Sequence, residues 1–155
     1  MIVDSLLLLS GTISNLNVVT GQTVTGTGNV LSTNTVDLLQ VRDIGEGKDI
    51  YARFQATVAQ AGGTSVECQC ITADDAALTT NVNVLATTGP ILTAAWPIGA
   101  RQAIKLSGKL SSKGQRYVGL RYVIVGTSTA GAFVGDLGLE SQGGGAFYPS
   151  GFAVI

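Results

Sequence analysis

The sequence contains no histidine among its 155 residues. Histidine supplies the base in Ser-His-Asp and Cys-His catalysis and is the commonest metal ligand, so those catalytic classes and the usual zinc sites are excluded. The glycine run at 143–145 lacks the Lys-Ser/Thr pair and the following helix of a phosphate-binding loop. Asp74 and Asp75 are adjacent acids without an EF-hand pattern, and we expect them to be solvated. We therefore expect no catalytic residues, no cofactor and no metal.

Charged side chains are also scarce. Nine Lys and Arg with ten Asp and Glu make up 12% of the chain, and the net charge is −1. An ordinary soluble domain carries roughly 25%, because surface charge keeps it in solution. With 45% hydrophobic residues, this chain is expected to cover much of its outer surface with other protein. No basic stripe is present to neutralise phosphates, so we expect no nucleic-acid partner.

Long apolar runs and cysteine pairs are missing as well. No run approaches the about 18 residues that a membrane-spanning helix needs, so we expect no membrane partner. The apolar run Leu6–Leu9 is short, follows Asp4 and has no positive segment before it, so we interpret it as part of the mature protein rather than a signal peptide. Cys68 and Cys70 are two apart, where a disulfide along one strand would be strained, and we expect two small buried thiols.

The pattern that is present is short-range alternation, and no segment of ten or more residues shows helical periodicity. The clearest strand is 50–58, with its even-numbered residues, Ile50 to Val58, on one apolar face. Residues 65–72 alternate again beyond a glycine turn at 61–64, which predicts a hairpin with 50–58. Further strands are predicted at 35–41, 82–87, 101–107, 116–125 and 132–139. Such a series of short strands predicts an all-β protein, a jelly roll or β-sandwich. The residues predicted to point inward from the later strands are Val66, Cys68, Cys70, Val118, Leu120, Tyr122, Ile124, Phe133, Leu137 and Leu139.

The composition divides the chain into three parts. Residues 1–34 are irregular and rich in Gly and Thr, and we interpret them as an N-terminal arm with an edge strand. Residues 35–141 form the predicted jelly-roll body. Residues 142–155 form an extended C-terminal apolar tail beyond a glycine joint. Such a tail must be buried, either on its own subunit or as an arm exchanged with a neighbour, and both alternatives stay open.

Exposed aromatic side chains could form a surface that binds sugars. Tyr122 is predicted to point into the core, whereas Tyr51 and Tyr117 point outward on strands that also carry Arg53 and Arg121. Tyrosine and arginine are favoured in protein–protein interfaces. Together with the low charge, this favours subunit contact over carbohydrate binding.

Six short motifs in order carry a resemblance to a known family. The chain resembles the small capsid cement (decoration) proteins of tailed phages, of the jelly-roll type found on short-tailed Bordetella-phage-like virions. The likeness spans about residues 35–141, and the ordered set is more specific than any single motif. The motifs are Arg42–Tyr51, Gly62–Ser65, Thr72–Asp75, Thr88–Ile91, Arg116–Tyr122 and Ala130–Phe133.

The resemblance implies a homotrimer at local three-fold positions on the outer surface of a capsid, made in the cytoplasm of a bacterial host. Its partners would be itself and the major capsid protein, whose neighbouring capsomers it would hold together. The alternatives are another virion component, such as a tail or fibre subunit, or a carbohydrate-binding jelly-roll module. The residues that we expect at subunit or capsid contacts are Leu6, Leu7, Leu8, Leu9, Arg42, Arg53, Arg121, Phe147, Tyr148, Phe152 and Ile155.

Overall fold

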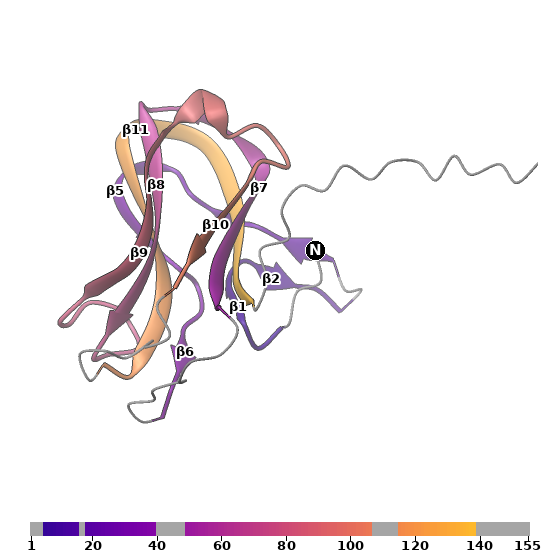
Figure 1. Cartoon of the computed structure of the whole chain (residues 1–155). Coiled ribbons are helices and arrows are strands. Elements are labelled where there is room, and N and C mark those ends of the chain that lie inside the picture. Colours follow the sequence, from indigo (N-terminus) through magenta and orange to yellow (C-terminus); the bar gives the residue numbers. More distant parts are fainter. Residues whose placement is uncertain (1–4, 16–17, 40–48, 107–114, 139–155) are drawn as a thin grey trace, which may run out of the picture.

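The structure, a computed structural model, describes residues 5–15, 18–39, 49–106 and 115–138 (Figure 1). These residues are almost entirely β-structure, which confirms the predicted all-β class. The strands are β1 (Leu8–Ser10), β2 (Thr12–Ile13), β3 (Val19–Thr20), β4 (Gln22–Thr23), β5 (Gly26–Leu31), β6 (Val36–Asp37), β7 (Tyr51–Gly62), β8 (Ser65–Ala73), β9 (Asn83–Leu92), β10 (Arg101–Lys105) and β11 (Tyr117–Gly138), and a 3-10 helix, η1 (Thr93–Ala95), follows β9.

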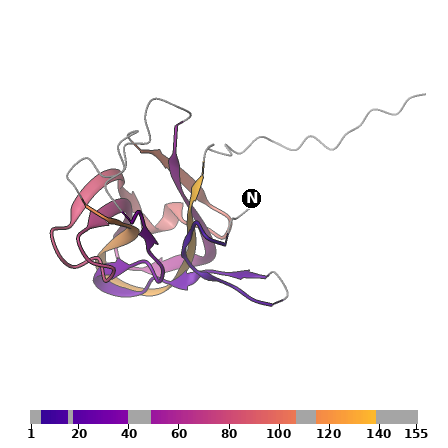
Figure 2. The same ribbon diagram turned by 90° about the horizontal axis from the view of Figure 1, so that it is seen from below.

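Strand β11 lies at the centre of the fold. The strand order is β10-β7-β11-β8-β9, and β1, β4, β5 and β6 also pair with β11. Its first part, residues 117–125, pairs with β8 and with β5 and β6, whereas its last part, residues 130–138, pairs with β7, β4 and β1. One strand of 22 residues therefore belongs to both layers, and the sheet curls over its own core nearly into a barrel (Figures 1 and 2).

The bend between the layers is built from small residues. Ser128 of β11 is in register with Gly26 on one side and Gly62 on the other, so the three strands turn together. The buried Ser128 hydroxyl lies 3.2 Å from the carbonyl oxygens of Ala61 and Ala130 and accepts a 2.6 Å hydrogen bond from the Gln60 side-chain amide. Glycines with positive φ adopt this bend without the steric cost that a side chain would bring.

The predicted hairpin between 50–58 and 65–72 is wrong in its pairing. Strands β7 and β8 follow one another in the chain, but β11 lies between them in the sheet and pairs with both. The turn at 62–64 carries β7 around the bend into the other layer. Alternation fixes which face of a strand is buried, and it carries no information on which strand lies next to it.

The core between the layers follows the predicted alternation. Four large side chains fill it: Phe54, Trp96, Tyr122 and Phe133 are at most 1% exposed. Phe54 and Tyr122 meet edge to face at 5.9 Å, and Trp96 and Phe133 do so at 5.0 Å, as aromatic pairs prefer. The predicted inward residues of β8 and β11 are buried as expected, except that Leu139 lies outside the described residues.

Two sequence expectations about strands are corrected in detail. Val58, predicted to point inward, is 46% exposed, because it sits opposite Ala132 where the β7–β11 register shifts and the alternation is locally broken. The strand predicted at 35–41 is shorter, since β6 covers only Val36–Asp37 and residues 40–41 lie outside the described part of the chain.

Both cysteines are buried free thiols, as predicted. Burial raises the pKa of the Cys70 thiol to about 12, and it raises the pKa of the Cys68 thiol beyond its usual range. Neither sulfur is a thiolate near neutral pH, so the two side chains act as small apolar residues of the core.

The expectation of a separate N-terminal arm is corrected for β1, β4 and β5. Strands β1, β4 and β5 pair with β11, and Leu8, Leu9 and Val24 are at most 4% exposed. The apolar side chains of this segment complete the core of their own subunit, which is why they are not free to extend from it. The short β2–β3 pair, by contrast, projects from the side of the barrel (Figure 2). Residues 142–155 lie outside the described residues.

The bend gives a prediction on stability. Gly62 has φ +68°, and a Cβ there would lie 2.7 Å from the Thr127 carbonyl oxygen, whereas Gly89 has φ +69° and open space around it. Gly89→Ala should cost about 1–2 kcal/mol of unfolding free energy, the cost of a side chain in the left-handed region. Gly62→Ala should cost at least about 1 kcal/mol more, because the Thr127 carbonyl oxygen must shift. Urea denaturation of both variants at one protein concentration checks this, and equal losses would show that the bend is not tightly packed.

Candidate interaction surface

The structure distributes the predicted contact residues over very different environments. Leu8 and Leu9 lie in the subunit core, Leu7 is half-buried against it, and Leu6 is 84% exposed. The remaining predicted residues of the loop and the tail, Arg42, Phe147, Tyr148, Phe152 and Ile155, lie outside the described residues. Of the leucine run, therefore, only Leu6 is largely exposed.

Arg53 belongs to a cross-strand ion pair inside the sheet. It lies opposite Asp136 in the β7–β11 register, and its guanidinium donates to both oxygens of that carboxylate, with 2.9 Å between Nε and Oδ1. Asp136 is fully buried and the Arg53 side chain is 12% exposed. Burial raises the pKa of the Asp136 carboxyl, and the Arg53 guanidinium opposes that rise. Arg53 thus compensates a buried charge of its own subunit.

Arg121 lies on the outer face of β11 within a polar row. Its Nε donates to the side-chain oxygen of Gln69 at 2.7 Å, the Gln69 amide donates to Glu67 at 2.5 Å, and the Thr87 hydroxyl donates to the same carboxylate oxygen at 2.6 Å. The row crosses β11, β8 and β9 in register. It holds the outer face of this layer in a defined, partly exposed polar arrangement.

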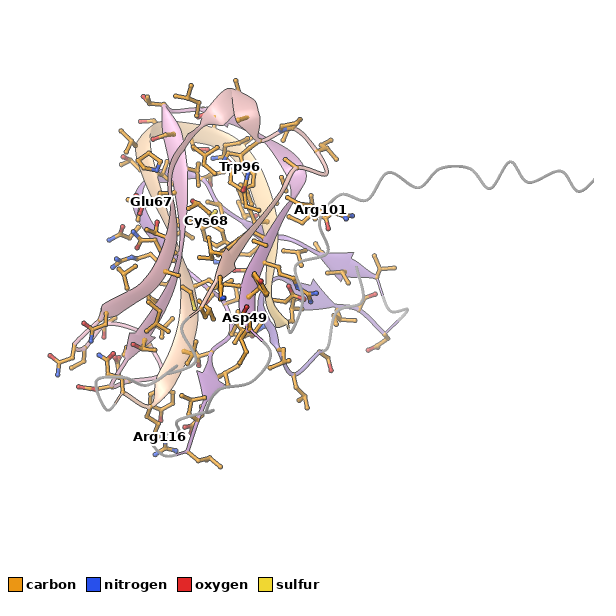
Figure 3. The ribbon with its side chains drawn as sticks, viewed as in Figure 1. Asp49, Glu67, Cys68, Trp96, Arg101 and Arg116 are labelled. Atoms are coloured by element: carbon orange, nitrogen blue, oxygen red, sulfur yellow. The ribbon has the colours of Figure 1, made fainter. Side chains whose placement is uncertain are left out.

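The aromatic residues form no exposed sugar platform among the described residues. Trp96 is fully buried and points between the layers, as Figure 3 shows. Tyr122 is buried as predicted, and Tyr51 and Tyr117 are half-buried. Tyr117 lies beneath the Arg116 guanidinium, 5.3 Å from its ring centre.

A hollow of about 340 Å³ opens where β8 ends and β9 begins. It is lined by Asp74, Asn81, Val82, Asn83 and Gln115. Its polar groups bond to one another: the Asn81 amide donates to Asp74 at 2.6 Å, and the Asn83 amide donates to the Gln115 side-chain oxygen at 2.9 Å. The polar side chains of the lining are therefore engaged in hydrogen bonds, and Gln115 also accepts one from the Thr72 hydroxyl behind it.

The described residues provide neither a metal site nor a membrane-spanning helix. Within the described ranges, no group of three or more His, Cys, Asp or Glu side chains is placed to hold a metal ion. Asp75 is engaged in its own turn, where its carboxylate accepts bonds from the Thr79 and Thr80 amides at 2.9 and 2.7 Å, and these bonds lower its pKa. In the same ranges, no helix is long and apolar enough to cross a membrane.

The charges of the chain are unevenly placed. Among the parts of the chain that the structure describes, four long stretches contain no Asp, Glu, Lys or Arg: residues 5–36, 54–66, 76–100 and 122–135. The fold brings parts of all four to the end of the barrel that holds the bend and η1, at the top of Figure 1. We call residues 23–29, 58–64, 91–99 and 125–131 the uncharged end. The charged residues labelled in Figure 3 lie along the sides or toward the other end.

The uncharged end exposes apolar side chains in two groups. Val125 and Leu92, 52% and 66% exposed, are both in register with Ser65 and so share one face of the sheet. Val58 and Ile98 are also exposed, and their segments are joined by a 2.8 Å bond from the Gly99 amide to the Ala56 carbonyl. Helix η1 lies in the chain between Leu92 and Ile98. It is hydrogen-bonded to the turn at residues 62–64, since the Thr93 amide donates to the Thr64 carbonyl at 3.1 Å.

None of these four residues was singled out from the sequence. Contact residues were predicted from apolar runs and single arginines. An isolated apolar residue between glycines and threonines shows neither pattern. The signal that identifies them is the absence of charge over long stretches, which becomes a surface only when the fold gathers the stretches at one end.

The Arg53–Asp136 pair gives a pH-dependent prediction. Arg53→Met leaves a buried carboxylate without its cation and should cost about 3 kcal/mol of unfolding free energy at pH 7.5. The pKa of Asp136 is already raised by burial and should rise further in the variant. The loss of unfolding free energy in Arg53→Met therefore applies above the pKa of Asp136 in the variant. It becomes smaller as the pH falls through that pKa, because the carboxyl binds a proton and loses its charge.

Urea denaturation at pH 7.5 and pH 5, at one protein concentration, measures this effect. Arg116→Met is the matched control, because it breaks the exposed pair with Asp37, in which the side chains are 47% and 34% exposed, and should cost at most about 1 kcal/mol. A loss in Arg53→Met that equals the control, or that is the same at both pH values, would contradict the assignment.

Comparison with known protein families gives a match to the Bbp16 family over residues 18–137, from just before β3 to the end of β11. The match covers more than half of the 155 residues and includes the whole uncharged end. The chain belongs to the Bbp16 family, a family of Bordetella phage proteins. None of the curated proteins matches the chain.

Proposed function

We propose that this member of the Bbp16 family is a capsid cement (decoration) protein without catalytic activity. It assembles as a homotrimer on the outer surface of the phage head and bridges neighbouring capsomers of the major capsid protein. Membership of a phage protein family supports a role in the virion. The finer assignment rests on the resemblance of residues 35–141 to cement proteins and on the surface chemistry.

The observation that carries the proposal is the uncharged end. A free soluble domain keeps charges of both signs interspersed over its surface. Here the described residues of one end include no charged side chain and expose Val58, Leu92, Ile98 and Val125. A surface of this kind is characteristic of a subunit that is permanently buried against protein.

The stabilising mechanism follows from multivalency. Packaged DNA presses the shell outward, and a shell under pressure separates first at the junctions between capsomers. A trimer that contacts several capsomers at once adds buried area at those junctions. Release requires all contacts to break together, so even weak single contacts give a long residence time.

The alternatives receive less support from the described residues. A carbohydrate-binding module needs exposed aromatic rings, and Trp96 is buried in the core while Tyr122 packs on Phe133. A tail or fibre subunit would share the low charge, and the position of the chain in the virion distinguishes it from a cement protein.

Binding to shells tests the proposal. The purified chain should have a mass of about 47 kDa by light scattering, three times 15.8 kDa, and should co-sediment with empty expanded shells that lack it. Shells already carrying the protein are the control, because their sites are filled and they should take up little more. A monomer that stays in the supernatant with both kinds of shell would contradict the cement function.

The apolar C-terminal segment gives a second test, because we propose that it makes contacts between subunits. Deletion of residues 146–155 should weaken trimer formation or shell binding at least tenfold, since the aromatic side chains of the segment lose their burial on a neighbour. Phe147→Leu with Phe152→Leu, which keeps the segment apolar, is the control and should retain both properties. A truncated chain that still forms trimers and still binds shells would show that the segment is not needed for contacts between subunits.

A further inference from the structure

We infer that the uncharged end is the surface through which copies of this chain contact one another. The inference rests on the proposed function for the existence of a homo-oligomer, and it adds the residues that form the contact. They are the exposed apolar side chains Leu92, Ile98, Val125 and Val58, with the glycines and threonines of the bend around them.

The shape and composition of the uncharged end suit contact with another protein. Leu92 and Val125 flank Ser65 on one face, and Ile98 stands on the turn after η1, so apolar side chains lie on both sides of the bend. Between them the exposed residues are small: Ala61, Gly62, Gly63 and Gly126 leave the backbone close to the surface, so another protein can approach closely. Apolar projections next to a low, small-residue ridge are suited to packing against a solid protein surface.

The lack of charge at this end favours a second copy of the chain as the partner. An end without charge is compatible with a copy of itself, because copies that meet there bring no like charges together. A different protein is usually selected by complementary charges, which steer encounter and reject wrong partners, and this end offers none. Permanent homo-oligomer contacts, in contrast, are the most apolar class of protein interface and are depleted in charge.

The opposite end of the barrel differs from the uncharged end in its charge. The opposite end carries exposed ion pairs, Asp37 with Arg116 at 2.5 Å and Asp49 with Lys105 at 2.7 Å. These pairs are suited to solvent or to a charged partner. The two ends therefore have separate chemistry, one for contact between copies and one for water or the shell.

Strand addition at the exposed sheet edge is a less suitable way for copies to meet. Strand β9 stands at one end of the strand order, and Pro90 within it removes a backbone donor from the edge. The ladder between β8 and β9 also shifts register twice. The contact inferred here instead uses side chains that project from the bend.

The test places charge in the contact. Leu92→Glu with Ile98→Glu puts two carboxylates on the uncharged end of every copy, at positions that are 66% and 72% exposed, so the subunit core is left intact. Multi-angle light scattering of the full chain should show the mass fall threefold, from trimer to monomer, at the same concentration. Circular dichroism should show an unchanged β-spectrum.

The matched control is Val18→Glu with Leu39→Glu, which adds the same charge at positions 56% and 68% exposed away from this end. It should keep the wild-type mass. The inference is overturned if the variant at the uncharged end keeps the wild-type mass, or if the control dissociates to the same extent.

Sedimentation of the wild-type chain with shells separates this inference from the proposed function. A wild-type chain that ignores shells, while charge at Leu92 and Ile98 still breaks its oligomer, removes the cement function and supports the contact. A wild-type chain that binds shells, together with a variant that stays trimeric, retains the function and removes the contact.

Discussion

The bend at Ser128 is the constraint on which the rest of the structure depends. Three neighbouring strands must fold from one layer into the other at the same level, and they do so where Gly26, Ser128 and Gly62 stand side by side. Large side chains would keep the layers apart there, as the short distance from the Gly62 Cβ position to the Thr127 carbonyl shows. The bend allows one strand, β11, to serve both layers and to close the aromatic core between them.

The same constraint shapes the outer surface. Residues around the bend are small or β-branched because the backbone turns tightly, and the Ser128 and Gln60 side chains are used internally to bond the turning strands. What is left exposed at this end is Gly, Ala, Thr, Asn29, Pro97 and a few larger apolar side chains. Charges are placed along the sides and at the opposite end, where Arg53 compensates the buried Asp136 and Arg116 pairs with Asp37. The residues that form the bend thus also form the proposed assembly surface.

Much of this could be predicted from local patterns in the sequence. Period-two alternation located β7, β8 and both ends of β11, with the inward faces of β8 and β11, because each strand has one face on the core. It divided β11 into separate strands at 116–125 and 132–139, whereas the structure has one strand through the bend. It could not reveal that β11 separates β7 from β8, since pairing between strands far apart in the chain leaves no local pattern. Leu8 and Leu9 were misplaced for a related reason: an apolar run does not state whether its own subunit or a neighbour buries it. The uncharged end is a property of the folded arrangement and could be recognised only once the four charge-free stretches lay together.

An electron cryomicroscopy reconstruction of the phage head, at a resolution that places side chains, tests the central claim most directly. The account predicts density for this fold on the outer surface of the shell at local three-fold positions. It further predicts that Leu92, Ile98 and Val125 of neighbouring copies are buried against one another. Density for the chain in the tail, or copies on the shell whose uncharged ends face open solvent, would contradict it.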